Sequence, residues 1–286
     1  MGINIRTNVA SLNAQRNLGA TSDRLNKAYS RLSSGLRITR ASDDAAGLSI
    51  AEQLKADQRI ASVAVRNAND GISIIAITDG AMNEITNILT RLAELAEQSA
   101  NGVFSVDQRS ALDLEFQALA SEMERIALTT SFNGLALLSG GASVTFQVGF
   151  DGSNNSIVTY SGVAATLSDL GLANSGSSQF LFSINDTTVP GAQAASRTAI
   201  DAIKLAIQSI TRDRGTLGAA ESRLNSAISN LLVARENFAS AESRIRDVDV
   251  AEEAAELTRL NILQQAAASV LAQANQQPSL ALSLLQ

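Results

Sequence analysis

The chain has 286 residues, of which 45% are hydrophobic and 17% charged, and it contains no His, no Cys and no Trp. Without His or Cys it lacks the Ser-His-Asp and Cys-His nucleophiles, the usual zinc sites and disulfides, so we expect neither an enzyme nor a cofactor or metal. The net charge of −6 argues against a nucleic-acid partner, because such a surface repels phosphates.

The composition favours long helices over a globule built around large rings. Aromatic residues make up only 3% of the chain, so its core must consist of Ala, Leu, Ile and Val. The charge is also unevenly distributed, with +4 over residues 1–45 and −3 over residues 240–286. We therefore expect the two ends of the chain to attract each other.

The first predicted element is a helix that seeks a helical partner. Leu18, Leu25 and Leu32 recur every seven residues, as in one seam of a coiled coil. The pattern stops at residues 33–35, Ser-Ser-Gly. Residues 42–44, Ser-Asp-Asp, then read as an N-cap cluster for a helix that begins near residue 45.

Two further helices follow, each with an apolar stripe at helical spacing. The second helix runs from about 45 to 100, and we expect Asn101 and Gly102 to end it with a left-handed cap. Its stripe comprises Ala81, Ile85, Ile88, Leu92, Leu95 and Ser99. The stripe of the third helix comprises Leu112, Phe116, Leu119, Met123 and Ile126, and residues 131–134 end it.

The middle of the chain differs from both flanks. No Lys or Arg occurs between Arg125 and Arg197, and Gly, Ser, Thr and β-branched residues dominate. Apolar residues alternate over 144–150, a turn signal follows, and a second β-branched run occupies 157–160, which predicts a β-hairpin. We expect a further short strand over 180–184.

The longest pattern begins at about residue 194. One heptad position is apolar throughout, which predicts a coiled-coil helix of roughly 40 residues. It is occupied by Ile203, Ile210, Leu217, Leu224, Leu231 and Phe238. The register breaks near residue 247. A last stripe then runs to residues 277–278 through Leu260, Leu263, Ala267, Val270 and Ala274.

The patterns together predict a mainly α fold. Long coiled-coil-like helices from both chain ends pack together, and a small insert rich in β-hairpins interrupts them. The sequence suggests three parts: residues 1–44 with 240–286 form an inner helical domain, 45–138 with 195–239 form a second helical domain, and 139–194 form the insert.

The terminal stripes are too narrow to bury themselves, which favours a self-assembling structural protein whose ends become ordered on assembly. Ordinary coiled-coil packing is the alternative explanation of these stripes. Arg37, Arg40, Asp43 and Asp44 lie around the bend between two helices. They form either an ion-pair cluster between subunits or a solvated turn.

Several separated motifs resemble those of bacterial flagellin. Toward the start they are residues 8–18 (NVASLNAQRNL), 31–38 (RLSSGLRI) and 43–48 (DDAAGL); in the middle, residues 131–134 (SFNG); and toward the end, residues 262–266 (ILQQA), 271–276 (LAQANQ) and 282–285 (LSLL). The resemblance spans about 1–140 and 195–286. The closest rival is the hook-filament junction protein, which has similar terminal helices, and a secreted translocator is a third alternative.

The resemblance implies a helical homopolymer, the extracellular filament of the bacterial flagellum, with the terminal helices in its core. It implies export through the flagellar channel without a cleavable signal peptide, an export chaperone on residues from about 240 to 285, and contacts with the filament cap and hook-junction proteins. No stretch is apolar enough to predict a membrane span. We assign assembly contacts to Leu18, Leu25, Arg31, Leu32, Arg37, Arg40, Asp43, Asp44, Leu260, Leu263, Val270, Leu271, Leu284 and Leu285.

One partner site follows from the resemblance residue by residue. Arg91, Leu95 and Glu115 occupy the flagellin positions that engage the flagellin-sensing toll-like receptor of animals. Leu95 also belongs to the apolar stripe of the second helix. Its primary role is therefore expected to be packing, with host recognition as a second use.

Overall fold

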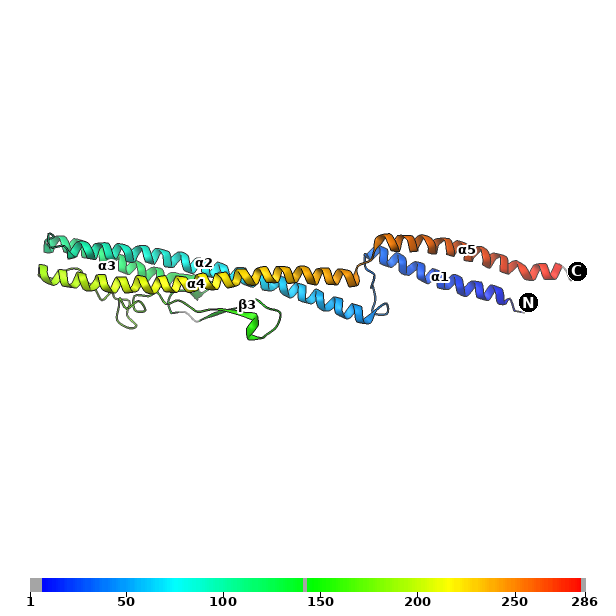
Figure 1. Ribbon diagram of the computed structural model, residues 1–286, viewed down its shortest axis with the longest axis horizontal. Helices are drawn as coiled ribbons and strands as arrows, with labels where there is room; N and C mark the ends of the chain where they lie inside the picture. Colours follow the sequence, from blue (N-terminus) through cyan, green and yellow to red (C-terminus); the bar gives the residue numbers. More distant parts are fainter. Residues whose placement is uncertain (1–6, 141–142, 284–286) are drawn as a thin grey trace. The chain divides into compact units, whose positions relative to one another are not determined.

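The computed structural model describes residues 7–140 and 143–283, and it is mainly α-helical as predicted (Figure 1). The helices are α1 (Val9–Ser34), α2 (Ala45–Ala100), α3 (Val106–Thr129), α4 (Val189–Arg246) and α5 (Val250–Ser283). The chain forms two compact units. Unit 1 contains Met1–Gln58 and Glu236–Gln286, and unit 2 contains Arg59–Arg235. Both α2 and α4 contribute residues to both units.

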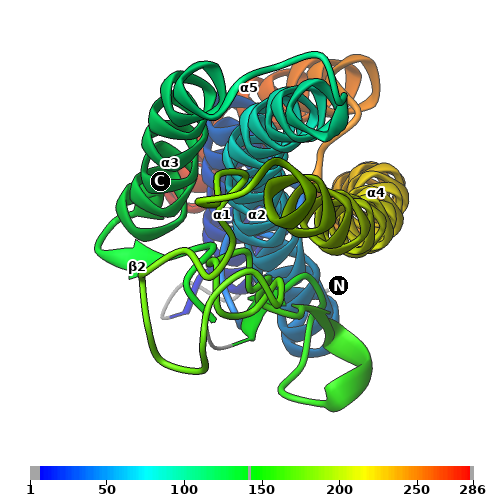
Figure 2. The ribbon, with the colours of Figure 1, turned by 90° about the vertical axis from the view of Figure 1, so that its left-hand side faces the viewer.

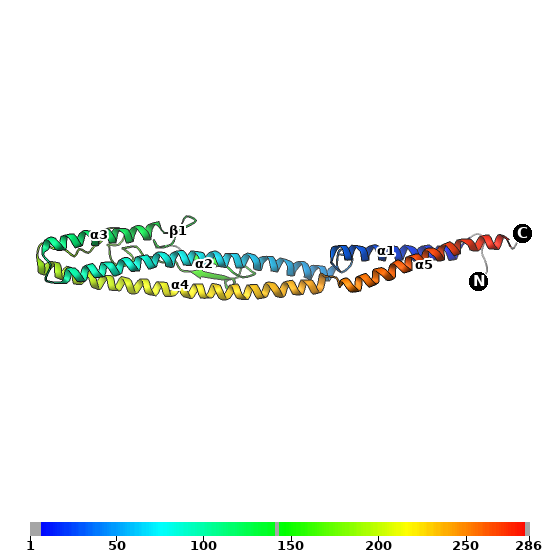
Figure 3. The same cartoon turned by 90° about the horizontal axis from the view of Figure 1, so that it is seen from above.

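In unit 1, the two terminal helices α1 and α5 run side by side (Figures 1 and 3), which confirms the predicted pairing of the chain ends. Leu25 and Ala28 of α1 pack against Leu260 of α5, and all three are at most 6% exposed. Asn8 Nδ2 donates a hydrogen bond of 2.8 Å to the carbonyl of Ala274 near the far end of the pair. The seam is narrow, because few large side chains are buried in it.

Charge contributes little to this seam. Within the described residues, the one ion pair between α1 and α5 joins Arg31 to Glu253 at 4.0 Å. Ion pairs at this distance near a surface stabilise by at most about 1 kcal/mol. The opposite charges of the two chain ends therefore favour encounter and orientation more than they hold the pair together.

The predicted stripe of α5 was partly wrong. Leu260 and Ala274 are buried as expected, but Leu263 is 43% exposed and Val270 is 56% exposed. The seam passes instead through Gln264, which donates to Ser22 Oγ at 3.3 Å, and through the half-buried Leu271. On a helix, the residues three and four positions after Leu260 both lie near its face. The prediction placed Leu263, the apolar one of the two, in the seam, but the structure places Gln264 there. The helix also continues past residues 277–278 to Ser283.

A short two-stranded joint connects these helices to α2 and α4. Gly35 ends α1 in the left-handed conformation, with φ of +71°, as the Ser-Ser-Gly break suggested. Leu36 then forms an antiparallel bridge with Asp247. The amide of Arg37 donates to the carbonyl of Arg246 at 2.6 Å, and that of Val248 donates to Gly35 at 3.1 Å.

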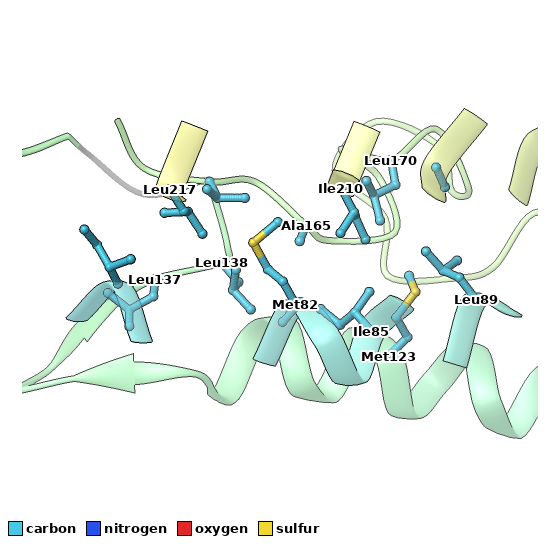
Figure 4. Packing of buried hydrophobic residues seen from close by; sticks show 14 of the residues in the cluster. Met82, Ile85, Leu89, Met123, Leu137, Leu138, Ala165, Leu170, Ile210 and Leu217 are labelled. Carbon is cyan, nitrogen blue, oxygen red and sulfur yellow. The ribbon is translucent and has the colours of Figure 1, made fainter. Parts of the chain in front are cut away.

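Unit 2 is built around α2, α3 and α4, which pack as three helices when seen end-on (Figure 2). The predicted stripes form its core. In α2, Ile85, Leu92 and Leu95 are at most 1% exposed. In α4 the predicted heptad positions are buried over most of their length, at Ile203, Ile210, Leu217, Leu224 and Leu231. Figure 4 shows how side chains from the three helices meet Leu137, Leu138, Ala165 and Leu170 of the segment between α3 and α4.

Two small antiparallel hairpins lie in the chain between α3 and α4. Strands β1 (Ser131–Phe132) and β2 (Leu135–Ala136) flank Asn133 and Gly134, whose positive φ values of 49° and 79° give the tight hairpin turn that Asn-Gly favours. Strands β3 (Val144–Gln147) and β4 (Ile157–Tyr160) form the predicted hairpin, and the single-turn 3-10 helix η1 (Asn154–Ser156) precedes β4.

The strand expected over 180–184 is reduced to a single antiparallel bridge between Phe180 and Ala173, and contacts with α3 anchor the rest of the segment. Phe180 packs edge-on against Phe116 of α3, with ring centroids 5.2 Å apart. Gln117 of α3 donates to the carbonyl of Phe182 at 2.8 Å, and Asp113 accepts from the amide of Ile184 at 2.9 Å. The apolar alternation therefore reflects docking onto a helix.

The left-handed cap expected at Asn101 and Gly102 was also wrong, since neither residue has a positive φ. The turn is closed by side chains. Ser105 caps α3 in a capping box with Gln108, and Arg109 reaches back to the turn. This end of α2 is therefore held by α3.

Truncating a buried leucine of α4 should cost more stability than truncating an exposed leucine of the same helix. Leu224 of α4 is fully buried, whereas Leu205 is 65% exposed. We expect Leu224→Ala to lower the free energy of unfolding by about 2–5 kcal/mol, because it leaves a cavity. Leu205→Ala should change it by less than about 0.5 kcal/mol. Urea unfolding followed by circular dichroism measures both, and equal losses would contradict the assigned register of α4.

Candidate functional site

The terminal helix pair carries an apolar surface that the chain itself does not cover. This terminal apolar surface comprises Leu12, Tyr29, Ile262, Leu263 and Val270, which are between 43% and 62% exposed. Within the described residues, the buried seam between α1 and α5 contains two large side chains, those of Leu25 and Leu260. More large apolar side chains lie outside this pair than inside it, which is typical of a surface that meets another molecule.

The expected assembly leucines fall into three groups. Leu25 and Leu260 are buried between α1 and α5, and Leu18, Leu32 and Leu271 are half-buried there. Leu263 and Val270 lie on the terminal apolar surface. Leu284 and Leu285 lie outside the described residues. The first group holds the pair together, and the second is available to a partner.

The charged residues of the joint have local partners within the chain. Asp43 accepts hydrogen bonds from Thr39 Oγ1 at 3.0 Å and from the amide of Arg40 at 3.2 Å, and its side chain is 9% exposed. The hydrogen bond from Thr39 is the main cause that lowers the pKa of Asp43. Lys27 Nζ lies 3.8 Å away. The Asp43 carboxylate thus fixes the turn before α2.

Asp44 and Arg37 complete this local structure. Asp44 Oδ1 accepts from the amide of Gly47 at 2.9 Å, so it is the N-cap of α2, as the Ser-Asp-Asp cluster predicted. Arg37 Nη2 donates to the carbonyl of Ile245 at 2.6 Å. Arg246, the last residue of α4, pairs with Glu52 at 2.7 Å. These contacts join the two connecting segments and both long helices at one place.

Arg91 and Glu115, two of the three residues expected at the receptor, are brought together on the surface. Arg91 donates to Glu115 Oε1 through Nη2 at 2.8 Å and through Nε at 3.0 Å, and to Glu94 at 3.1 Å. The hydrogen bond with Glu115 is the main cause that raises the pKa of Arg91. The side chains of Arg91 and Glu115 are 49% and 46% exposed.

The third residue, Leu95, is not on that surface. It is 1% exposed and belongs to the core of unit 2. A partner that docks on the Arg91–Glu115 pair therefore meets the polar face of α2 and α3, while Leu95 supports that face from beneath.

Sequence reasoning missed Arg109, which is fully buried and has no carboxylate partner among the residues that the structure describes. Its guanidinium donates to the carbonyls of Asn101 at 2.8 Å and Phe104 at 3.2 Å, and to Ser99 Oγ at 3.4 Å. The carbonyls at the end of a helix carry partial negative charge, which favours a cation there. The one available signal was the Ser-x-x-Gln capping box at Ser105, which places the residue in the first turn of α3.

None of the helices in the described part of the chain is long and apolar enough to cross a membrane.

Comparison with known proteins identifies the family. Residues 5–143 match the model of the bacterial flagellin N-terminal helical region, and residues 200–285 match that of the C-terminal helical region. A flagellin of Halalkalibacterium halodurans is 43% identical over 282 residues, covering 98% of this chain and 99% of its own. Flagellin B of Vibrio cholerae is 35% identical, with 100% of both chains covered.

Among solved structures, one named as a flagellar hook-associated protein from Vibrio parahaemolyticus is similar in fold, with a TM-score of 0.51 and 13% identity. The similarity covers 72% of this chain and 97% of that one, and at this identity it concerns the fold alone. Both helical family regions match, and the identity to flagellins extends over the whole chain. The chain therefore belongs to the bacterial flagellin family, whose members are structural subunits of the extracellular flagellar filament.

Proposed function

We propose that this chain builds the filament through its terminal apolar surface, with the α1 and α5 pair in the filament core. The observation that carries this proposal is the terminal apolar surface itself, since Leu12, Tyr29, Ile262, Leu263 and Val270 are exposed on α1 and α5. Second copies of the chain would cover them.

The terminal pair becomes fully ordered only on polymerisation in this proposal. Helices of 26 and 34 residues must be fixed, and among their described side chains the large ones buried between them are Leu25 and Leu260. The conformational entropy of that many residues exceeds what so small a core offsets. Neighbouring copies would supply the missing burial.

The same exposed surface suggests the other partners. An apolar, extended segment needs a cover before export, and an export chaperone on residues from about 240 to 285 would provide it. Filament cap and hook-junction proteins would meet the same helices at the two ends of the polymer. Export without a cleavable signal peptide belongs to the same proposal.

A second role, as ligand of the host flagellin-sensing toll-like receptor, rests on the exposed Arg91–Glu115 pair. Two N–H groups of Arg91 donate to one carboxylate oxygen of Glu115, which fixes the guanidinium, and Arg is frequent among residues that dominate binding energy. In this proposal Leu95 acts by supporting the surface, since it is buried.

A hook-filament junction protein and a secreted translocator are the alternative functions. The identity of 43% to a flagellin over nearly the whole chain favours the filament subunit. Negative-stain microscopy after polymerisation distinguishes the alternatives. Long helical filaments are expected of a filament subunit, and short assemblies or none would favour the other two.

A charge on the terminal apolar surface should block polymerisation without unfolding the chain. We expect Val270→Asp to abolish filament growth, because each subunit contact would bury an unpaired carboxylate. The thermal transition of unit 2 should not change, because Val270 lies in unit 1. Sedimentation of polymer measures growth, and circular dichroism measures the transition.

Gln265→Asp provides the matched control, since Gln265 is an exposed polar residue of the same helix. It adds the same charge outside the terminal apolar surface, so filaments should still form. Growth of Val270→Asp filaments at the wild-type rate would contradict the proposed surface.

The receptor role predicts a loss of signalling when the charge of Arg91 is reversed. We expect Arg91→Glu to lower the potency of the monomer in receptor reporter cells about tenfold or more, as for a residue that dominates an interface. Arg125→Glu is the matched control, because Arg125 forms a similarly exposed pair with Glu122 on α3, at 2.5 Å. Equal potency of the Arg91→Glu and Arg125→Glu monomers would remove the pair from the receptor surface.

Leu95→Asp is expected to lose both filament formation and signalling, because it places a carboxylate in the core of unit 2. The unfolding transition measured by circular dichroism should fall with it. A Leu95→Asp monomer that keeps its stability and loses only signalling would instead assign Leu95 to direct receptor contact.

A further inference from the structure

The chain contains two Asn-Gly sequences, and both are exposed. Asn101 and Gly102 lie in the turn between α2 and α3, and Asn133 and Gly134 form the turn of the β1–β2 hairpin. In such a sequence the backbone nitrogen of the glycine can attack the side-chain amide carbon of the asparagine, because glycine has no side chain to block the approach. The surroundings of each asparagine in the folded chain then set how fast it reacts.

A backbone N–H points at the side-chain oxygen of Asn101. The amide of Val103 donates to Asn101 Oδ1 at 3.2 Å. Attack on Cγ would place negative charge on this oxygen, and a fixed N–H donor stabilises that charge without having to reorient. The capping box at Ser105 begins α3 directly after the turn, so the donor is held in place. The turn therefore makes Cγ of Asn101 a better electrophile.

The buried Arg109 acts on the attacking nitrogen. Its Nη2 donates to the backbone carbonyl of Asn101 at 2.8 Å. This carbonyl and the amide of Gly102 form one peptide unit, in which electrons are delocalised from nitrogen to oxygen. A charged donor on the oxygen increases that withdrawal, so the N–H of Gly102 loses its proton more readily. Within the described residues, no acceptor is hydrogen-bonded to this N–H.

The second Asn-Gly sequence lacks both features. Asn133 and Gly134 are held at φ of 49° and 79° by the strands on either side, where Phe132 pairs with Leu135. In the part of the chain that the structure describes, no donor is hydrogen-bonded to the side chain of Asn133. Closing a ring at this site requires the hairpin turn to open first. Asn133 is therefore an internal comparison for Asn101.

We propose that Asn101 is a site of spontaneous deamidation, accelerated by the α2–α3 turn. The nitrogen of Gly102 gives its proton to water and attacks Cγ of Asn101. The bond from Cγ to Nδ2 breaks, and Nδ2 takes up a proton from water and leaves as ammonia. One water molecule then opens the succinimide ring, which leaves an aspartate or an isoaspartate at position 101. This covalent change needs no second copy of the chain, so it goes beyond the proposed assembly and does not depend on it.

Arg109 also favours one of the two products. Isoaspartate forms when water attacks the former backbone carbonyl of Asn101, which is the carbonyl that Arg109 polarises. The oxygen that accepts from Arg109 then belongs to a carboxylate. The buried guanidinium thereby gains an ion-pair partner, which it lacks among the described residues. Isoaspartate is therefore the expected main product in the folded chain.

Incubation of the soluble full chain in mildly alkaline buffer tests the site. Peptide mapping by mass spectrometry measures the loss of both asparagines in the same sample. In the folded chain Asn101 should deamidate about tenfold or more faster than Asn133, because a preorganised donor faces its side-chain oxygen. In urea, where neither turn exists, the two should react at similar rates. Equal rates in the folded chain, or a ratio that urea leaves unchanged, would overturn the proposal.

A pair of variants isolates the donor. Val103→Pro removes the N–H that faces Asn101 Oδ1, and should slow the reaction of Asn101 about tenfold. Val103→Ala is the matched control, because it keeps the N–H and should react like the wild type. The side chain of Val103 is 85% exposed, so neither change removes a buried contact. A Val103→Pro chain that melts like the wild type and deamidates at the wild-type rate would contradict the role of this donor. If Val103→Pro melts lower, the comparison of folded with urea-unfolded wild type decides.

The ratio of the two products tests the role of Arg109. Labelling with an isoaspartyl methyltransferase measures the share of isoaspartate at position 101. This share should be higher after reaction in the folded chain than after reaction in urea, because Arg109 polarises the carbonyl only in the folded turn. An equal share under both conditions would contradict the role assigned to Arg109.

Discussion

The structure depends on one constraint, the narrowness of the apolar stripe on each terminal helix. In unit 2 the stripes of α2, α3 and α4 meet one another and the insert, so their large side chains are buried. Within the described residues of the terminal pair, only Leu25 and Leu260 are large and buried, while seven large apolar side chains of α1 and α5 are exposed. Such a chain buries the apolar stripes of unit 2 by itself, whereas the exposed apolar side chains of α1 and α5 need other copies to cover them.

The sequence alone predicted the elements whose stripes are long and regular. The heptad series of α4 fixed its buried face from Ile203 to Leu231, and the Asn-Gly and β-branched patterns located the hairpins. In α5 the pattern was ambiguous, because Leu263 and Gln264 are consecutive and either can follow Leu260 along a helix. Partner geometry, not hydrophobicity, selects the polar Gln264, whose amide reaches Ser22.

The charged residues were less predictable than the stripes. Asp44 was readable as an N-cap because a local backbone rule places it, and its bond to Gly47 obeys that rule. Arg109 followed no such rule, since its partners are carbonyls that only the folded turn brings within reach. Leu95 shows a further limit. Its stripe correctly placed it in the core, whereas the family resemblance placed it among receptor contacts.

The terminal pair is tied at both ends. Asn8 holds Ala274, and Gly35 accepts from Val248, so the segments between these bonds have nearly equal lengths. Adding a residue to one helix alone would break one of the ties or shift every seam residue by about 100° around the axis. The lengths of α1 and α5 are therefore coupled, and a change in one requires a compensating change more than 200 positions away. Surface loops of the insert carry no such coupling and can lengthen at little entropic cost.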